Sequence, residues 1–367
     1  MDYRGFHGEG QWYKGNLHCH TTISDGNLTP EEVVDLYKSH GYSFLAISDH
    51  NIYTDFGSSF NSEDFVILPA VEAAAVLVER EGSSNCLKTH HIHGILAPSA
   101  GDGAAASAPG NCGAAGEGHE CGSAPADTAA AKDFFAAAAA DGQNGAPLEH
   151  MEEVPTRVFA GQWDGAAVAQ ALSDDLRARS CITIYNHPIW SRVRESEFIH
   201  TTGLTALEIY NYNTVNESGT GYDTTYWDVM LREGKKIWGV ASDDNHNTEY
   251  FEDSCGGFIV VKAPKLSRED ITQAIVDGNY YSSSGPEIYD WGIHDQVAYV
   301  TCSPVERVNF IAGNYVGAGA TVLSEDGSDS VDYALLRLRG DETYVRVECV
   351  DSHGRTAWSN PIFLERP

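Results

Sequence analysis

Hydrophobic and polar positions in the first hundred residues alternate between the period of a strand and that of a helix. Apolar runs predict strands at 16–20, 43–48, 65–68 and 92–97. Thr29 and Glu32 have the spacing of a capping box, with Pro30 in the first turn, so we expect a helix to begin there and to end at Gly41. Strands that alternate with helices predict a parallel α/β sheet with crossover helices.

The same alternation resumes at residue 163. Helices are predicted at 163–179, 222–232 and 266–277, and strands at 181–185, 204–210, 236–241 and 257–261. After residue 286 the helical period is absent, and short alternating runs follow at 297–302, 305–311, 331–338 and 344–350. We therefore predict an α/β domain over residues 1–285 and a small antiparallel, β-sandwich-like domain over 286–367.

A low-complexity segment interrupts the first domain from residue 99 to between 147 and 160. Ala and Gly dominate it, and it has few large apolar residues besides Phe134 and Phe135. Such a composition cannot bury enough surface to offset its ordering entropy, so we interpret 99–160 as a disordered insertion with a short Ala-rich helix near 128–140. A separate metal site at Cys112, His119 and Cys121 is the less favoured interpretation.

Composition narrows the class of protein. The 367 residues are 42% hydrophobic, which supports a packed core, and no apolar run is long enough for a membrane span. Because no secretory signal is visible, we expect a cytoplasmic protein. Acidic residues outnumber basic ones 53 to 23, giving a net charge of −30, which disfavours long nucleic acids as partners. Eight cysteines without a CxxC pair predict reduced thiols, and Cys19 is interpreted as a core residue.

Side chains that can bind metals follow the predicted strands. His18 and His20 are two residues apart, so both face the same side of a strand and can bind one ion. Parallel α/β folds place their sites at the carboxyl ends of strands, so these side chains are expected to meet in one site. The candidate ligands are His18, His20, Asp25, His50, Glu72, His93, His187, Asp244 and His246.

Imidazole and carboxylate ligands without a thiolate suit Mn, Zn or Fe. Nine ligands exceed the need of one ion, so we expect two or three divalent ions, with Glu72 as a bridging ligand. Asp49 and either His90 or His91 are expected to orient the ligands through hydrogen bonds.

In order along the chain, these motifs resemble the PHP (polymerase and histidinol phosphatase) superfamily. The resemblance spans residues 13–285 without the insertion, and the segment 280–286 is similar to the end of the catalytic domain in members with a C-terminal β domain. The motifs are His18-Cys19-His20 with Asp25, Ser48-Asp49-His50, Glu72, His93, Asn186-His187-Pro188 and Asp244-Asn245-His246.

The resemblance implies a distorted (β/α)7 barrel with up to three divalent ions. It implies one ion among His18, His20, Glu72 and Asp244, a second among Glu72, His93 and His187, and a third among Asp25, His50 and His246. His91 shares a strand face with His93 and stays open as the alternative ligand.

The expected function is that of a metal-dependent phosphoesterase on a small phosphorylated metabolite. The substrate would be a sugar phosphate or nucleotide, as a monoester or a cyclic diester, attacked by a hydroxide that bridges the ions. The expected catalytic residues are Glu72, His93, Asp244 and His246, and the candidates for binding phosphate are Lys14, Arg192 and Arg194.

Two other interpretations stay open. One is a metallohydrolase of a carbamate or a carboxylic ester, and the other is a non-catalytic, metal-stabilised binding module. Basic residues that converge on the site would favour phosphate, because a neutral ester does not need them.

Overall fold

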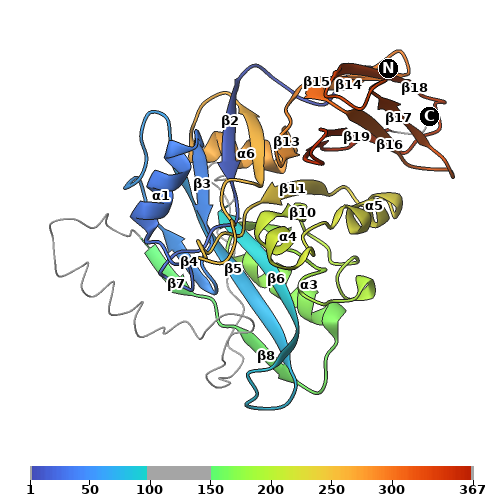
Figure 1. The fold of residues 1–367 in the computed structure, drawn as a ribbon. Helices are drawn as coiled ribbons and strands as arrows, with labels where there is room; N and C mark the ends of the chain where they lie inside the picture. The colour runs from blue at the N-terminus through green and yellow to red at the C-terminus, as the bar shows by residue number, and fades with distance from the viewer. Residues whose placement is uncertain (1, 97–149, 365–367) are drawn as a thin grey trace.

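The computed structural model describes residues 2–96 and 150–364. These residues form a sheet-rich, mixed α/β fold with one large mixed sheet and one four-stranded antiparallel sheet (Figure 1). The predicted α/β class is confirmed, whereas the (β/α)7 barrel stays a prediction.

Strands outnumber helices in the first part of the described chain. The helices are α1 (Pro30–Ser39), α3 (Gly165–Ala178), α4 (Tyr212–Ser218), α5 (Thr224–Arg232) and α6 (Arg268–Val276), with a 3-10 turn at Glu195–Glu197. The strands are β1 (Tyr3–Arg4), β2 (Gln11–Asn16), β3 (Phe44–Ile47), β4 (Ile52–Asp55), β5 (Val66–Val78), β6 (Cys86–Leu96), β7 (His150–Glu153), β8 (Arg157–Ala160), β9 (Cys181–Tyr185), β10 (Ala206–Asn211), β11 (Trp238–Ser242), β12 (Phe258–Ala263) and β13 (Tyr280–Ser283).

Helix α1 begins as the sequence predicts. The hydroxyl of Thr29 accepts a hydrogen bond from the backbone N–H of Glu32, and the Glu32 carboxylate accepts one from the backbone N–H of Thr29. The helix buries Val33 and Tyr37 in the same hydrophobic cluster as Leu45 of β3, which fixes the helix against the sheet.

Strand pairing brings the carboxyl ends of several strands to one side. β2, β3 and β5 pair in parallel, and so do β9, β10 and β11. A parallel bridge between Cys19 and Asn245 joins the residues after β2 to those after β11. The expected crossover between β5 and β6 is absent, because these two strands form an antiparallel hairpin and β6 also pairs antiparallel with β9. The prediction of parallel neighbours is therefore wrong for β6.

Among the described residues beyond 286, the regular secondary structure consists of strands. They are β14 (Ile288–His294), β15 (Val297–Val305), β16 (Arg307–Ala312), β17 (Gly319–Leu323), β18 (Val331–Arg337), β19 (Tyr344–Val350), β20 (Thr356–Ser359) and β21 (Ile362–Phe363). β14, β15 and β18 form the smaller sheet with β1, and their Trp291 and Val300 share a core with Val308 and Val347 of β16 and β19. β13 pairs with β20, so the large sheet continues into this region, and the domain boundary at 286 stays a prediction.

One buried cation connects β19 with α5. Arg346 is 1% exposed and forms hydrogen bonds with both carboxylate oxygens of Asp228, at 3.0 and 2.9 Å. It also binds Glu348 at 2.7 Å and lies 4.7 Å from the ring of Trp227. The paired carboxylates offset the cost of burying this charge.

Two expectations about the insertion and the cysteines need correction. Residues 150–160, which we placed at the end of the disordered insertion, carry the strands β7 and β8. The expected helix at 128–140 and the candidates Cys112, His119 and Cys121 lie outside the described residues. Cys86 is disulfide-bonded, so the expectation of reduced thiols is wrong for this residue. The cytoplasmic location stays a prediction.

Among the helices of residues 2–96 and 150–364, none combines the length and the apolarity needed to cross a membrane.

Candidate metal centre

The first group of candidate ligands is built by the residues that follow β2 and β11. The strand predicted at 16–20 ends at Asn16, but backbone hydrogen bonds to the segment after β11 keep the next residues in line, with the Asp244 N–H donating to the His18 carbonyl at 3.0 Å. His18 Nε2 and His20 Nε2 lie 2.9 and 3.0 Å from Asp244 Oδ1. Glu72 Oε1 of β5 lies 3.2 Å from His18 Nε2, so these four residues form one compact group.

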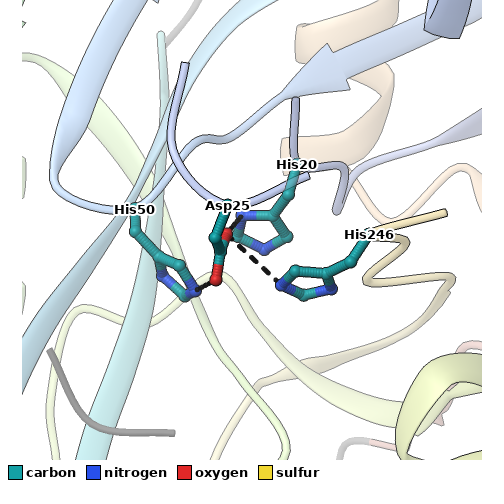
Figure 2. A group of neighbouring side chains, drawn as sticks. All are labelled: His20, Asp25, His50 and His246. Atoms are coloured by element: carbon teal, nitrogen blue, oxygen red, sulfur yellow. Dashed lines mark ion pairs between the residues drawn. The ribbon is translucent and has the colours of Figure 1, made fainter. Parts of the chain in front are cut away.

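A second group surrounds Asp25, as Figure 2 shows. His50 Nε2 lies 3.6 Å from Asp25 Oδ2, and His246 Nε2 lies 3.5 Å from Asp25 Oδ1. His20 Nδ1 lies 3.7 Å from Asp25 Oδ1, so His20 faces both groups with its two ring nitrogens. The carboxylate of Asp49 accepts hydrogen bonds from Thr21 and Ser24 at 2.7–3.2 Å, and it thereby holds the loop that carries Asp25.

A third group forms around Glu72 and includes His91 of β6. His91 Nδ1 and His187 Nε2 both lie 3.2 Å from Glu72 Oε1, and His50 Nδ1 lies 3.0 Å from Glu72 Oε2. His93 stands opposite Glu72 in the β5–β6 register, but its ring packs edge-on against His18 at 4.1 Å. Among the ligand groups found in the described residues, His91 is present and His93 is absent. His93 Nε2 is, like His91 Nδ1, buried without a hydrogen bond, so the choice between His91 and His93 as a ligand stays a prediction.

Glu208 is a residue of the centre that the sequence did not reveal. Its Oε1 accepts hydrogen bonds from His18 Nδ1 at 2.9 Å and from Ser242 Oγ at 2.5 Å. Its Oε2 accepts from the backbone N–H of His187 and from Asn211 Nδ2, both at 3.0 Å. A carboxylate has about four lone-pair positions, and these donors occupy them, so Glu208 orients His18 rather than offering a free ligand atom.

The buried polar atoms of the centre test whether the residues fit divalent ions. Asp25 Oδ2, Glu72 Oε2 and His91 Nδ1 are buried and form no hydrogen bond, although each lies 3.0–3.6 Å from a nitrogen or oxygen of another candidate ligand. Buried polar groups normally have partners, because an unpaired group costs about 1–3 kcal/mol. Short separations without hydrogen bonds are what ligands directed at a shared ion would show, so the donor set fits a metal cluster.

The titration of the histidines follows from their neighbours. Burial lowers the pKa of His18, but Asp244, Glu72 and Glu208 outweigh it and raise this pKa well above its ordinary value. Burial also lowers the pKa of His246, yet Asp25 raises it to about 9. Burial together with His50 and His246 lowers the pKa of His20 to about 3. Without metal, the neighbouring carboxylates therefore favour the protonated forms of His18 and His246, whereas burial favours neutral His20.

Backbone strain coincides with these residues. His187 and Asp244 have φ angles of 22° and 58°, and Asn51, next to His50, has 56°. This region disfavours side chains with a Cβ, and such strain persists where the surroundings fix it, often at functional sites. The Asn51 amide illustrates the support, because its Oδ1 accepts from the Ala74 N–H at 2.9 Å.

The structure gives little support to the predicted phosphate-binding cations. The ammonium of Lys14 lies over the rings of Tyr42 and Phe258, at 4.1 and 4.2 Å, and burial lowers its pKa. Lys14 is thus engaged by two aromatic rings, and its role as a phosphate ligand stays a prediction. Arg192 and Arg194 are exposed, and their role as phosphate ligands stays a prediction.

No protein-family model and no curated protein sequence matches the chain. Among solved structures, it is similar to a two-domain protein from Bacteroides vulgatus that contains a predicted PHP-like metal-dependent phosphoesterase, with 10% identity, a TM-score of 0.42, and 96% of this chain and 93% of that chain covered. A protein from Bifidobacterium adolescentis, inferred to be a metal-dependent phosphoesterase, has 14% identity and a TM-score of 0.37, covering 72% of this chain and 95% of its own. An amidohydrolase from Chromobacterium violaceum with bound sulfate and no metal has 13% identity and a TM-score of 0.36, covering 72% and 96%. All three TM-scores are below 0.5, so the function is argued from the site itself.

Proposed function

We propose that this protein is a metal-dependent phosphoesterase that hydrolyses a small phosphorylated metabolite, as a monoester or a cyclic diester. The observation that carries the proposal is the convergence of overlapping His, Asp and Glu groups whose ligand atoms lie within 4.8 Å of one another. Structural metal sites normally close with four ligands around one ion. The overlapping groups here share His20, Glu72 and His50, which is the arrangement expected for a catalytic cluster of two or three Mn, Zn or Fe ions.

Each ligand set is assigned from the contacts above. His18, His20, Glu72 and Asp244 would hold one ion, and Asp25, His50 and His246 a second. Glu72, His91 and His187 would hold a third. Bound divalent ions would supply the positive charge that activates water and stabilises phosphoryl oxygens.

Residues of the centre would position the ions and the other ligands. Glu72 contacts both His18 and His187, so it is the natural bridge between ligand sets. Glu208 fixes the proton of His18 on Nδ1, because an ionised carboxylate only accepts, and this leaves Nε2 free to bind. The His246 side chain is 24% exposed and that of Asp244 is 9% exposed, so His246 is the more accessible to a substrate and Asp244 would act beside it.

We also propose that the strands around this centre form the distorted (β/α)7 barrel. β2, β3, β5, β6, β9, β10 and β11 are paired in succession, and the Cys19–Asn245 bridge links the last to the first. His18, His20, Asp244 and His246 follow the ends of β2 and β11 in that ring, whereas Glu72 and His91 lie within the long strands β5 and β6. This arrangement would bring residues from 18 to 246 to one place.

One observation favours the hydrolysis of a carbamate or a carboxylic ester as a second candidate. Lys14 is engaged by two rings, and Arg192 and Arg194 are exposed, so few cations assist the ions in binding phosphate. A neutral ester would not need such cations.

Phosphate release by the manganese-loaded protein tests the proposal. The panel holds sugar phosphates, nucleotides and small cyclic phosphodiesters, together with carboxylic and carbamic esters, and His20→Ala is the inactive control. Release of phosphate that is lost in the variant supports the phosphoesterase. Hydrolysis of the neutral esters alone would reject it in favour of the second candidate.

A further inference from the structure

Trp190 lies in a rigid turn next to the candidate ligands. The turn follows β9 and is closed by hydrogen bonds from the Ser191 N–H to the His187 carbonyl at 3.1 Å and from the Arg192 N–H to the Ile189 carbonyl at 3.2 Å. Asp223 Oδ1 accepts from the Ile189 N–H at 3.2 Å, which ties the turn to the start of α5. The position of the indole is therefore fixed by its backbone.

The indole ring borders two candidate ligands. Its centroid lies 5.1 Å from that of His187, at an interplanar angle of 84°, and 6.0 Å from that of His91. His187 and His91 are 1% and 4% exposed, whereas Trp190 is only half-buried. Trp190 is thus the more accessible neighbour of both imidazoles and forms part of the rim of the centre.

The interactions still available to the Trp190 side chain are apolar. Its one hydrogen-bond donor, Nε1, is used by Glu217 Oε2 of α4 at 2.6 Å. With Nε1 paired, the half-buried indole offers aromatic surface, which favours planar rings. The carboxylate of Glu217 beside it disfavours a second phosphate at the same place.

We propose that Trp190 determines specificity by stacking on a planar ring in the leaving group, while the phosphate binds at the His, Asp and Glu groups. This inference rests on the proposed function and narrows its substrate class to phosphate esters whose leaving group carries a flat, uncharged ring close to the ester oxygen. The competing role is purely structural, with Trp190 only shielding His187 from water.

The chain offers a matched control in Trp163. Trp163 stacks on His90 at 5.0 Å, and its Nε1 donates to Glu197 Oε1 at 3.0 Å, which repeats the Trp–His–Glu arrangement. His90 is adjacent to His91 on β6, so its side chain points to the opposite face of the sheet. Trp163 therefore has the same local partners without the candidate ligands.

Calorimetry with phosphonates tests the inference on the manganese-loaded full chain. Phenylphosphonate and methylphosphonate share the phosphate-like head and differ in the ring, so the ratio of their dissociation constants isolates the ring. We expect the wild type and Trp163→Leu to bind phenylphosphonate about tenfold more tightly, as for one stacked ring. Trp190→Leu, which keeps apolar packing, should bring the ratio to about one, and Trp190→Phe should retain most of the preference.

Each other outcome overturns the inference. A Trp190→Leu variant that weakens both phosphonates equally has lost a structural residue, and one that keeps the ratio has no stacking role. Because phosphonates are not hydrolysed, the ratio of dissociation constants decides the role of Trp190 independently of activity. If phenyl phosphate and glycerol phosphate were both left intact, that result would reject the proposed function alone. A protein that binds neither phosphonate would reject both.

Discussion

Glu208→Gln is the substitution that most directly tests how the centre is held. The carboxylate accepts four hydrogen bonds, two on each oxygen. An amide places an NH2 group where one oxygen was. At the Oε2 position it would face two donors, His187 N–H and Asn211 Nδ2, and at the Oε1 position it would face one, His18 Nδ1, because the Ser242 hydroxyl can rotate and accept. If the NH2 faces His18 Nδ1, the imidazole can keep a hydrogen bond only by moving its proton to Nε2, the atom directed at the candidate ligands.

The expected losses of stability and of metal affinity follow from these contacts. One or two lost partners at about 1–3 kcal/mol each predict a loss of about 1–6 kcal/mol in the free energy of unfolding. Misplacing the proton of a metal-binding histidine costs about 10–100-fold in metal affinity. Asn211 cannot rotate its amide to compensate, because its Oδ1 caps α4 by accepting from the Thr214 N–H at 2.9 Å.

The assay is competition for Mn²⁺ between the protein and a fluorescent chelator, with denaturant unfolding measured in parallel. Glu342→Gln is the control, because Glu342 is also buried and also accepts from backbone N–H groups, those of Arg339 and Gly340, both at 2.9 Å. The control should lose stability and keep its manganese affinity. Wild-type affinity in Glu208→Gln would refute the assignment of Glu208 as the residue that orients His18.

Three further predictions follow from the structure. His91→Ala should lower the amount of manganese retained after dialysis, whereas His93→Ala should retain it and lower the melting temperature, as measured by metal analysis and calorimetry. The pKa of His246 is about 9 in the folded, metal-free protein, against about 6.5 when unfolded, so up to about 3 kcal/mol of stability is present below pH 6.5 and lost as the pH rises through 9. Manganese affinity should rise over the same pH range, because the ion displaces that proton. Arg346→Met should cost up to about 3 kcal/mol in denaturant unfolding, because Asp228 loses its buried partner.

For each of these predictions, one result would contradict the reasoning. Equal manganese retention in the two histidine variants would remove the distinction between His91 and His93. Stability of the metal-free protein that rises between about pH 7 and 9 would contradict a protonated His246. The exposed Arg337 serves as the control for Arg346, and an Arg337→Met variant that is equally destabilised would show a general effect of lost charge.

The candidate ligands could be found from the sequence because the pattern that marks them is local. His18 and His20, and likewise Asp244 and His246, stand where apolar runs end, and strand ends can be predicted from hydrophobic periodicity. The choice between His91 and His93 could not be made in this way. Both face the same side of β6, and which of them meets Glu72 depends on how the hairpin with β5 is placed over His18.

Glu208 was missed for a different physical reason. In the run Leu207-Glu208-Ile209, an acidic residue between apolar ones is typical of a half-exposed strand, where it would face solvent. The structure buries both faces of β10, and the donors that satisfy the carboxylate come from residues 18, 187, 211 and 242. Partners this far apart in the chain do not affect the hydrophobic periodicity of the sequence. The antiparallel β5–β6 hairpin could not be predicted for a similar reason, because the direction of a strand depends on its neighbours in the sheet.

The distribution of charge explains how such an acidic centre can fold before it binds ions. Asp25, Glu72, Glu208 and Asp244 are buried together, and within the described residues their ion pairs are with histidines. Neighbouring carboxylates raise the pKa of His18, His187 and His246 against the effect of burial, so these three imidazoles can carry positive charge in the metal-free protein. Metal binding would then exchange protons for divalent ions at nitrogen atoms that already lie close to the carboxylates, rather than assemble the centre anew. The ligands would accordingly be held in nearly the same positions in both states, and the affinity for metal would be set by the pH at which these protons leave.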